Sequence, residues 1–280
     1  PDYDNNPWNY KFTWNPRNVV LSGQGTAQYI EDGKIKYIPY SKLFERTEKM
    51  SILNAGEFEA YANRDSLSYR KPYGIEDVST LLRGTLRRKG YSNSWNYFIQ
   101  LGLTDDTYSI ENSKELTYRD FLNMFLPFSK NHTIEEKFCI EFGISEESIE
   151  FSKIKWLDIF TNKKVEIENA SPAQILQKIL EEKWTLSAED KDMIVMEHQF
   201  KYNILGEERK LNSSLLVFGD NQIDTSMAKT VGLPVAIAVK LILNGDIKSK
   251  GVKIPTTKDI YIPVLKELEE YGIKFIEKEI

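Results

Sequence analysis

Hydrophobic and polar residues follow two different periods along the 280-residue chain. Side chains that alternate between apolar and polar are typical of half-buried strands. Apolar residues that recur every three or four positions are typical of helices with one buried face. By these criteria the sequence predicts helices throughout residues 93–186, and strands at residues 35–40, 57–62, 79–87, 193–202, 209–220 and 273–276.

The predicted helices begin at residues that favour helix starts. Thr117 precedes an apolar face, and Thr133 with Glu136 has the spacing of a capping box. Ser171 stands directly before Pro172, and proline is favoured at the first helical position. These signals support a predominantly helical region in the middle of the chain.

A further helix is expected over residues 19–31, ending at the turn Asp32-Gly33. Within it, Gly23-Gln24-Gly25 has the spacing that opens a dinucleotide-binding loop. That fingerprint also requires a third glycine and a preceding parallel strand. Position 28 is a glutamine, and the context is helical, so we expect no nucleotide site here.

A last long helix is expected to begin at Thr225 or Ser226. Residues 235–243 are nearly all apolar, and a helix that is apolar on every side must be buried. We therefore expect it to pack on the sheet or against a neighbouring domain. Pro234 is expected to kink or interrupt it. Its first turn, around Ser226 and Met227, is expected to offer unpaired N–H groups to an anion.

Together these elements define an α+β protein. The strands on both sides of the helical region must pair across it, which predicts a mixed, mostly antiparallel sheet with helices on one face. We expect residues 1–92 and 187–280 to form one α/β domain, interrupted by a helical subdomain at residues 93–186. The aromatic-rich residues 1–18 are expected to be ordered and packed, because such side chains bury a large area.

Composition narrows the class of protein. The net charge of −5 and the pI near 5.4 argue against a nucleic-acid partner. A single cysteine, Cys139, excludes an intrachain disulfide and fits a reducing compartment such as the cytoplasm. With only two histidines, no metal site is expected. The longest apolar run, residues 231–243, is short and contains Lys240, so no membrane partner is expected.

Arginine is concentrated in one stretch, residues 61–91. Five of the nine arginines of the chain lie there, at positions 64, 70, 83, 87 and 88. Arginine presents a planar fork of donors that matches a carboxylate or phosphate, whereas lysine, which is used elsewhere, is a point charge. This local concentration in an acidic protein predicts a site for an anionic partner.

The predicted strands orient these arginines. Period two places Arg83, Thr85 and Arg87 on one face of the strand at residues 79–87. Arg64 follows the strand at residues 57–62, at a strand end, where ligands commonly bind. An alternative stays open at this point: the stretch could be a solvated basic strand whose arginines pair with nearby acids.

The sequence identifies no general acid or base. His198 lies in the middle of a predicted strand, and no partner for it is visible in the sequence.

Four short runs resemble the saccharopine dehydrogenase family, also called the saccharopine reductase family, over nearly the whole chain. Their order and spacing match as well. The chain resembles the part that follows the dinucleotide-binding Rossmann segment of these enzymes. The runs are KFTW at residues 11–14, YANRDS with LRGTLR at 61–66 and 82–87, DKDMIVM at 190–196, and MAKTVGLP with GDI at 227–234 and 245–247.

The resemblance implies a substrate-binding domain with an antiparallel sheet like that of the second domain of glyceraldehyde-3-phosphate dehydrogenase, interrupted by an all-helical domain. It implies that Arg64, Thr85, Leu86 and Arg87 contact saccharopine, which carries three carboxylates. The parent enzyme is expected to be a dimeric, NAD- or NADP-linked oxidoreductase of lysine metabolism. Because the Rossmann segment is absent, the chain alone is expected to bind no cofactor and to be inactive.

Three residues depart from the family pattern. Ala62 and Leu67 stand where proline and threonine are common, and Arg88 stands where an aromatic residue usually follows Leu-Arg. The identity of the substrate therefore stays open. One alternative is a sister dehydrogenase that acts on another carboxylated secondary amine, such as carboxynorspermidine. The other is a non-catalytic binding or dimerisation module.

Overall fold

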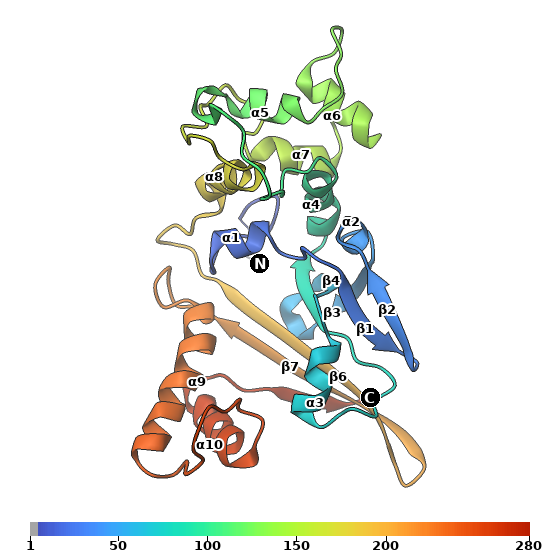
Figure 1. Ribbon diagram of the computed structural model, residues 1–280. Helices are drawn as coiled ribbons and strands as arrows, with labels where there is room; N and C mark the ends of the chain where they lie inside the picture. Colours follow the sequence, from blue (N-terminus) through green and yellow to red (C-terminus); the bar gives the residue numbers. More distant parts are fainter. Residues whose placement is uncertain (1–4) are drawn as a thin grey trace. The chain divides into compact units, whose positions relative to one another are not determined.

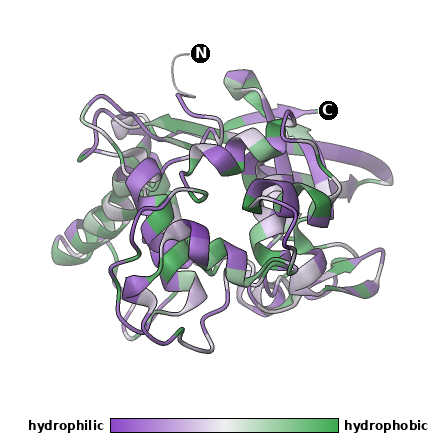
Figure 2. Ribbon diagram, turned by 90° about the horizontal axis from the view of Figure 1, so that it is seen from above, coloured by the Kyte–Doolittle hydropathy of each residue, from purple (hydrophilic) through white to green (hydrophobic). Residues whose placement is uncertain are grey.

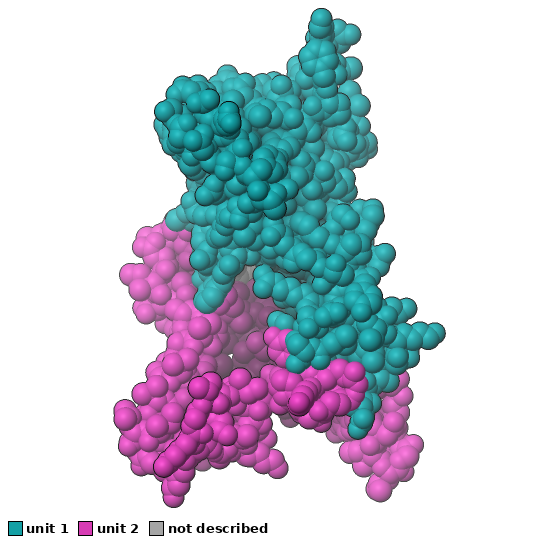
Figure 3. Space-filling model, in the orientation of Figure 1, with its two compact units in different colours: residues 1–50, 58–68, 77–185 teal, residues 51–57, 69–76, 186–280 magenta. Residues whose placement is uncertain are grey.

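The computed structural model describes residues 5–280, and contacts within the chain divide it into two compact units (Figure 3). Unit 1 comprises Pro1–Met50, Phe58–Ser68 and Asp77–Thr185, and unit 2 comprises Ser51–Glu57, Tyr69–Glu76 and Leu186–Ile280. The division predicted above, residues 1–92 with 187–280 around a helical subdomain at 93–186, stays a prediction.

Unit 1 starts with α1 (Pro16–Val20), followed by an antiparallel hairpin of β1 (Ala27–Glu31) and β2 (Lys34–Ile38). The helix predicted at residues 19–31 is therefore wrong beyond α1. Gly23 and Gly25 have φ angles of +80° and +91°, which no right-handed helix accepts. Asp32-Gly33 forms the two-residue hairpin turn with positive φ that this dipeptide favours, so it joins two strands rather than a helix and a strand.

The second sheet of this part contains β3 (Thr47–Ser51), β4 (Glu57–Ala62) and β5 (Gly84–Arg88), in that order. β4 has the predicted bounds, whereas β5 is only the second half of the predicted strand. Before it, Leu81 makes an isolated bridge to Ile30. The antiparallel register of β4 and β5 places Glu59 opposite Arg87 and Tyr61 opposite Thr85, on one face of the sheet.

The remaining residues of unit 1 are largely helical, as predicted. Figure 2 shows hydrophobic and hydrophilic residues on the same helices, as expected for amphipathic elements. The start signals are confirmed, because Thr117, Thr133 and Ser171 form capping boxes with residues three positions later. The helices are α2 (Tyr40–Leu43), α4 (Tyr91–Gln100), α5 (Tyr118–Met124), α6 (Ile134–Phe142), α7 (Ile149–Trp156) and α8 (Pro172–Trp184).

Unit 2 is built on a long hairpin of β6 (Met193–Ile204) and β7 (Glu207–Phe218), with β8 (Ile276–Glu279) on the other edge of β7 (Figure 1). The predicted hairpin is confirmed. The helices α9 (Ser226–Leu243) and α10 (Lys258–Leu268) pack on this sheet. Short helical turns complete the chain: α3 (Arg70–Tyr73), η1 (Leu53–Ala55), η2 (Leu67–Tyr69), η3 (Ser113–Glu115) and η4 (Glu269–Tyr271).

The combination of helices with antiparallel strand pairing is as predicted. The described strands nevertheless form three separate sheets instead of one sheet that crosses the helical region. Each sheet joins strands that lie close in the sequence, apart from β8. Short loops close at a lower entropic cost than long ones, which favours this local pairing.

α9 differs from the predictions in length and in burial. It continues through Pro234 and extends over 18 residues, because proline removes one hydrogen bond and bends a helix without necessarily ending it. Only Ser226 and Ile237 are buried, whereas Val235 is 63% and Leu243 80% exposed, so the expected burial is not found in this chain. Within residues 5–280 it alone is long and apolar enough to cross a membrane, which by itself is weak evidence of a membrane span.

Candidate functional site

Arg87, near the end of β5, is surrounded by tyrosine side chains. Its guanidinium carbon lies 5.1 Å from the ring centre of Tyr10 and 5.3 Å from that of Tyr91. Tyr61 projects from the same face of the sheet, opposite Thr85. The Nη1 group of Arg87 donates to the carbonyl of Leu86 at 3.1 Å, and its buried Nε has no hydrogen-bond partner among residues 5–280.

Aromatic packing positions these tyrosines. The ring centre of Tyr10 lies 5.0 Å from that of Trp184 and 5.5 Å from that of Tyr91. The N–H of Phe12 donates to the carbonyl of Trp184 at 2.7 Å, which fixes the N-terminal segment on the end of α8. The predicted order of residues 1–18 is confirmed from residue 5 onward, and the first four residues lie outside the described part.

No carboxylate in the described chain pairs with Arg87. Glu59 is the nearest acid in the strand register, but the N–H groups of Gly90 and Ser92 donate to its two oxygens at 2.8 and 3.3 Å. These bonds cap the start of α4, where N–H groups lack helical partners. The alternative of a solvated arginine paired with a neighbouring acid therefore does not hold for Arg87.

Lys153, from α7, lies beside this cap and is 3% exposed. Gly90 has a φ of +79°, a backbone conformation that favours glycine, and a side chain there would come within 2.9 Å of Nζ of Lys153. Burial lowers the pKa of Lys153, and the charge of Glu59 partly opposes this shift. Glu59 therefore stabilises the start of α4, with Lys153 beside it, and does not neutralise Arg87.

The charges of this cluster are well defined. Burial alone would lower the pKa of Arg87, but Tyr61, Tyr10 and Tyr91 reverse the effect, so its pKa is raised and it stays positively charged. Burial raises the pKa of Tyr91 well above its ordinary value and raises that of Tyr10, with Arg87 opposing both shifts. The two hydroxyls therefore stay neutral near physiological pH.

Three polar atoms of the cluster are buried without a partner in the described part of the chain. They are Nε of Arg87 and the hydroxyl oxygens of Tyr61 and Tyr91. A buried polar group without a hydrogen bond costs about 1–3 kcal/mol, and a charged group costs more. A buried cation surrounded by neutral donors, whose neighbouring acid Glu59 is already bound by N–H groups of α4, is arranged to receive an anion.

The structure brings together two of the four predicted site residues. Thr85 and Arg87 project from the same face of β5. Leu86 projects from the opposite face, opposite Ala60, and only its carbonyl turns to Arg87. These contacts agree with the predicted arrangement of the strand, and the contact of each residue with a ligand stays a prediction.

Arg64 lies apart from the Arg87 cluster. It follows β4 in a turn with a φ of +49°, its carbonyl accepts the N–H of Gln28 at 2.9 Å, and its exposed side chain has no hydrogen-bond or ion-pair partner among residues 5–280. Arg87 faces Glu59 within the pairing of β4 and β5, whereas Arg64 lies in the turn beyond the end of β4. That both arginines contact one ligand stays a prediction.

Sequence reasoning missed the three tyrosines. Tyr61 and Tyr91 are the first and last residues of the arginine-rich stretch, and Tyr10 stands directly before the KFTW run. A tyrosine is more often a core residue than a ligand contact, and only the shared proximity to Arg87 distinguishes these three.

The anion site predicted at the start of α9 is wrong. The carboxylate of Asp192 accepts the N–H groups of Ser226 and Met227 at 2.5 and 3.0 Å. The helix start therefore carries its own anion, supplied from a residue that lies 34 positions earlier.

His198 gains no acid–base partner. Its ring packs near Phe200 and Phe275, with ring centres 6.1 and 5.6 Å apart, and lines a hollow of about 640 Å³ in unit 2. No hydrogen bond to its imidazole is found within residues 5–280.

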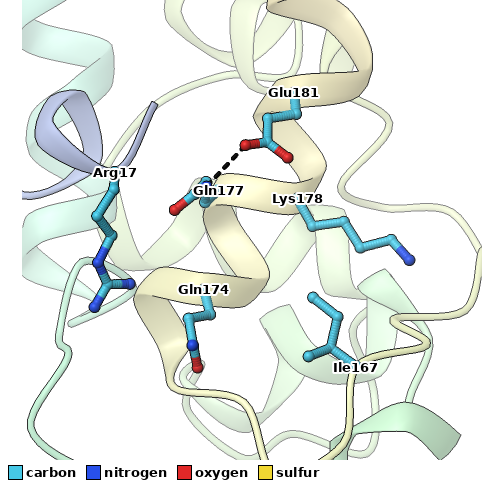
Figure 4. Close-up of a pocket in the computed structure, with 6 residues that line it drawn as sticks. All are labelled: Arg17, Ile167, Gln174, Gln177, Lys178 and Glu181. Carbon is cyan, nitrogen blue, oxygen red and sulfur yellow. Dashed lines mark hydrogen bonds between the residues drawn. The ribbon is translucent and has the colours of Figure 1, made fainter. Parts of the chain in front are cut away.

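A groove of about 620 Å³ follows the exposed side of α8 (Figure 4). Gln177 donates to Glu181 at 2.8 Å, Lys178 pairs with Glu166 at 3.1 Å, and Arg17 pairs with Asp106. Figure 4 shows Lys178 pointing away from Arg17, so the two cations do not converge. Although Nη1 of Arg17 is buried without a partner, its charge is compensated, and this groove is a weaker candidate than the Arg87 cluster. It is lined by Arg17, Ile167, Gln174, Gln177, Lys178 and Glu181.

Fold and site together define a protein of mixed helices and antiparallel sheets, with a buried, uncompensated arginine suited to a carboxylate. Comparison with known proteins agrees with this class. The family described as saccharopine dehydrogenase C-terminal domain matches residues 1–273. The chain belongs to this family.

Several known proteins match all or nearly all of this chain. The chain is 34% identical to mitochondrial alpha-aminoadipic semialdehyde synthase of Rattus norvegicus, over 98% of this chain and 30% of that protein. It is 31% identical to saccharopine dehydrogenase [NADP(+), L-glutamate-forming] of Saccharomyces cerevisiae, over 100% of this chain and 64% of that protein. The solved apo structure of the L-Glu-forming yeast saccharopine dehydrogenase has a TM-score of 0.87 at 29% identity, covering 100% of this chain and 64% of that one. The chain thus spans less than two thirds of these relatives.

Proposed function

We propose that this chain is the substrate-binding portion of an NAD- or NADP-dependent saccharopine dehydrogenase of lysine metabolism. A nicotinamide cofactor bound by the parent enzyme would exchange a hydride with the carbon that bears the secondary amine of saccharopine. The role of this portion is to orient saccharopine through arginine–carboxylate contacts. Orientation of a bound substrate can contribute several kcal/mol to lowering a barrier.

The observation that supports this proposal best is the buried positive charge of Arg87, which has no carboxylate partner in the described chain. Saccharopine carries three carboxylates, one of which would compensate that charge. Thr85 lies on the same strand face, and Arg64 is exposed and free to reach a second carboxylate. The yeast relative is named saccharopine dehydrogenase, and the saccharopine dehydrogenase C-terminal domain family matches residues 1–273.

The dinucleotide does not fit the described residues. Its usual binding fold needs parallel strands joined through a helix, with a glycine-rich turn. The pairs β1–β2, β4–β5, β6–β7 and β7–β8 are antiparallel, and the isolated bridge from Gln28 to Asp65 is parallel but joins no strands through a helix. We therefore assign cofactor binding to a part of the parent outside this chain and propose that the chain alone is inactive. Turnover by the isolated chain with added NADP and saccharopine would contradict this.

An arginine substitution in the full-length parent tests the site. Arg87→Ala should raise the KM for saccharopine by roughly 30-fold or more, since losing one partner of a buried charge pair costs about 2–5 kcal/mol. Arg88→Ala is the matched control, because Arg88 lies on the opposite strand face with its guanidinium carbon 4.6 Å from the ring centre of Phe58. An Arg87→Ala enzyme with unchanged kcat and KM would refute the assignment.

The choice of substrate is tested by profiling the same parent enzyme. Saccharopine should be preferred over carboxynorspermidine and other carboxylated secondary amines. A preference for carboxynorspermidine would support the sister dehydrogenase, and no oxidation of any of these amines would support a non-catalytic binding or dimerisation module.

The proposed partners follow from the same family membership and from the surface. We propose a homodimeric parent in the cytoplasm that binds neither nucleic acid nor membrane, in line with the acidic composition and the single cysteine. The exposed apolar residues of α9 support a contact with the dinucleotide-binding portion that the chain lacks. The antiparallel pairing also supports the proposed likeness to the second domain of glyceraldehyde-3-phosphate dehydrogenase.

A further inference from the structure

The tyrosines around Arg87 have polar groups that the described fold does not use. Tyr61 comes from β4, Tyr91 from the first position of α4, and Tyr10 from the N-terminal segment. The hydroxyls of Tyr61 and Tyr91 are almost completely enclosed and find no acceptor for their protons in the described residues; beside Tyr91 lies the guanidinium of Arg87, which can only donate. Buried hydroxyls normally have a hydrogen-bond partner, so two such groups beside one buried cation require an explanation.

Matched tyrosines elsewhere in unit 1 show the normal pattern. The hydroxyl of Tyr40 bonds to Thr104 Oγ1 at 3.0 Å, and the hydroxyl of Tyr118 bonds to Glu182 Oε1 at 2.6 Å. Tyr61 and Tyr91 differ because their surroundings are aromatic rings and a guanidinium, none of which accepts a hydrogen bond well. A ligand with acceptor oxygens would satisfy both hydroxyls.

Arg87 cannot saturate a carboxylate alone. Its Nη1 already donates to the carbonyl of Leu86, so not all of its N–H donors are available to a carboxylate. Its Nε is buried and donates to no acceptor in the described residues. A carboxylate has two oxygens with about four lone-pair directions. Hydroxyl donors from Tyr61 and Tyr91 would fill the remaining directions without adding charge.

The charge of the cluster also selects the ligand. One guanidinium with neutral phenols gives a local charge that matches one carboxylate, whereas a phosphate carries nearly two negative charges. The rings of Tyr10 and Tyr91 stabilise the guanidinium from their faces at 5.1 and 5.3 Å and hold it in place. The site is therefore suited to the single carboxylate of an amino acid.

We infer that the hydroxyls of Tyr61 and Tyr91 bind, together with Arg87, one carboxylate of the substrate, and that Tyr10 holds the guanidinium in position for it. Tyr61 and Tyr91 are thus specificity-determining residues for a carboxylate-bearing substrate. This inference rests on the proposed function.

The test uses Tyr61→Phe and Tyr91→Phe in the full-length parent enzyme, because phenylalanine keeps the ring and removes only the hydroxyl. Each variant should raise the KM for saccharopine by at least about tenfold while kcat changes little, since the contact persists from the bound substrate to the transition state. Tyr97→Phe is the matched control, because Tyr97 packs on Phe142 with ring centres 4.5 Å apart, away from Arg87, and its KM should not change.

A second measurement separates binding from folding. Saccharopine is compared with analogues in which one carboxylate at a time is converted to its amide. The Tyr→Phe variants should lose the preference for saccharopine over one of these amides. If that preference is unchanged, the inference is overturned, even where a variant also lowers the melting temperature.

The outcomes also separate this inference from the proposed function. If Arg87→Ala weakens saccharopine binding while both Tyr→Phe variants bind normally, the inference fails and the proposed function stands. If Arg87→Ala also leaves binding unchanged, both fail.

Discussion

Replacing Asp192 with asparagine should destabilise unit 2 without altering its surface. Asp192 is buried, and its two carboxylate oxygens accept the N–H groups of Ser226 and Met227 at 2.5 and 3.0 Å. Its charge also faces the positive end of α9, an 18-residue helix. Asparagine is nearly the same size, so the change removes one acceptor and the charge but creates no cavity.

The magnitude follows from these two losses. A hydrogen bond to a charged group contributes about 1.5–3 kcal/mol. A charge at a partly buried helix end contributes up to about 2 kcal/mol. The losses overlap, because the amide oxygen keeps one bond while its NH₂ group opposes the other N–H. We therefore expect Asp192→Asn to lower the free energy of unfolding by about 2–4 kcal/mol.

The assay is urea unfolding of the chain, followed by far-ultraviolet circular dichroism. Asp220→Asn is the matched control, because Asp220 is exposed and pairs on the surface with Lys229, and such pairs contribute only about 0–1 kcal/mol. Equal urea midpoints for the two variants would show that the N–H groups of α9 find water or another acceptor, and the reasoning would be refuted.

The other predictions concern neighbouring features of the fold. Gly219→Ala should lower the free energy of unfolding of unit 2 by more than about 1 kcal/mol. The added methyl would collide with the carboxylate of Asp192 and lie 2.9 Å from the N–H nitrogen of Ser226. A Gly219→Ala chain with the same urea midpoint as wild type would contradict this. Burial raises the pKa of the Tyr91 hydroxyl on folding, so the neutral hydroxyl adds its full share to the free energy of unfolding below about pH 10, and this share is lost as pH rises further. Between pH 8 and pH 11 the urea midpoint of wild type should therefore fall more than that of Tyr91→Phe. Equal falls in the two midpoints would exclude this role of Tyr91. Val235→Lys on the exposed side of α9 should reduce self-association of the isolated chain, measured by sedimentation velocity, and leave the melting temperature unchanged. Unchanged association would show that this side of α9 does not mediate contacts between chains.

Local signals in the sequence predicted most of the individual elements. Thr133 and Glu136 lie three residues apart and mark the start of α6 by themselves, and the alternation in residues 57–62 gives β4. The failure at residues 19–31 has the same origin, because small residues at helical spacing do not reveal that Gly23 and Gly25 adopt positive φ. Short-range patterns predict an element well only where its backbone geometry is ordinary.

The candidate site depends on contacts between distant segments. The arginine-rich stretch predicts an anion site, which stays a prediction, and the strand period placed Thr85 and Arg87 together, as the structure has them. The tyrosines around Arg87 come from three separate elements, and no periodicity links Tyr10 to Arg87 across 77 positions. The start of α9 was misjudged for the same reason, since the acid that caps it lies in another element. Such pairs form only when the chain folds.

The aromatic packing around Arg87 has a practical consequence for spectroscopy. Trp8, Trp95 and Trp184 are completely enclosed, and their ring centres lie 5.6, 5.7 and 6.2 Å from that of Tyr91. Their intrinsic fluorescence should therefore be emitted at short wavelength, and a ligand that changes the field of the guanidinium should alter its intensity. Trp14 is half exposed and would contribute most of the long-wavelength background, so Trp14→Phe would give a chain whose emission reports occupancy of the cluster without any attached dye.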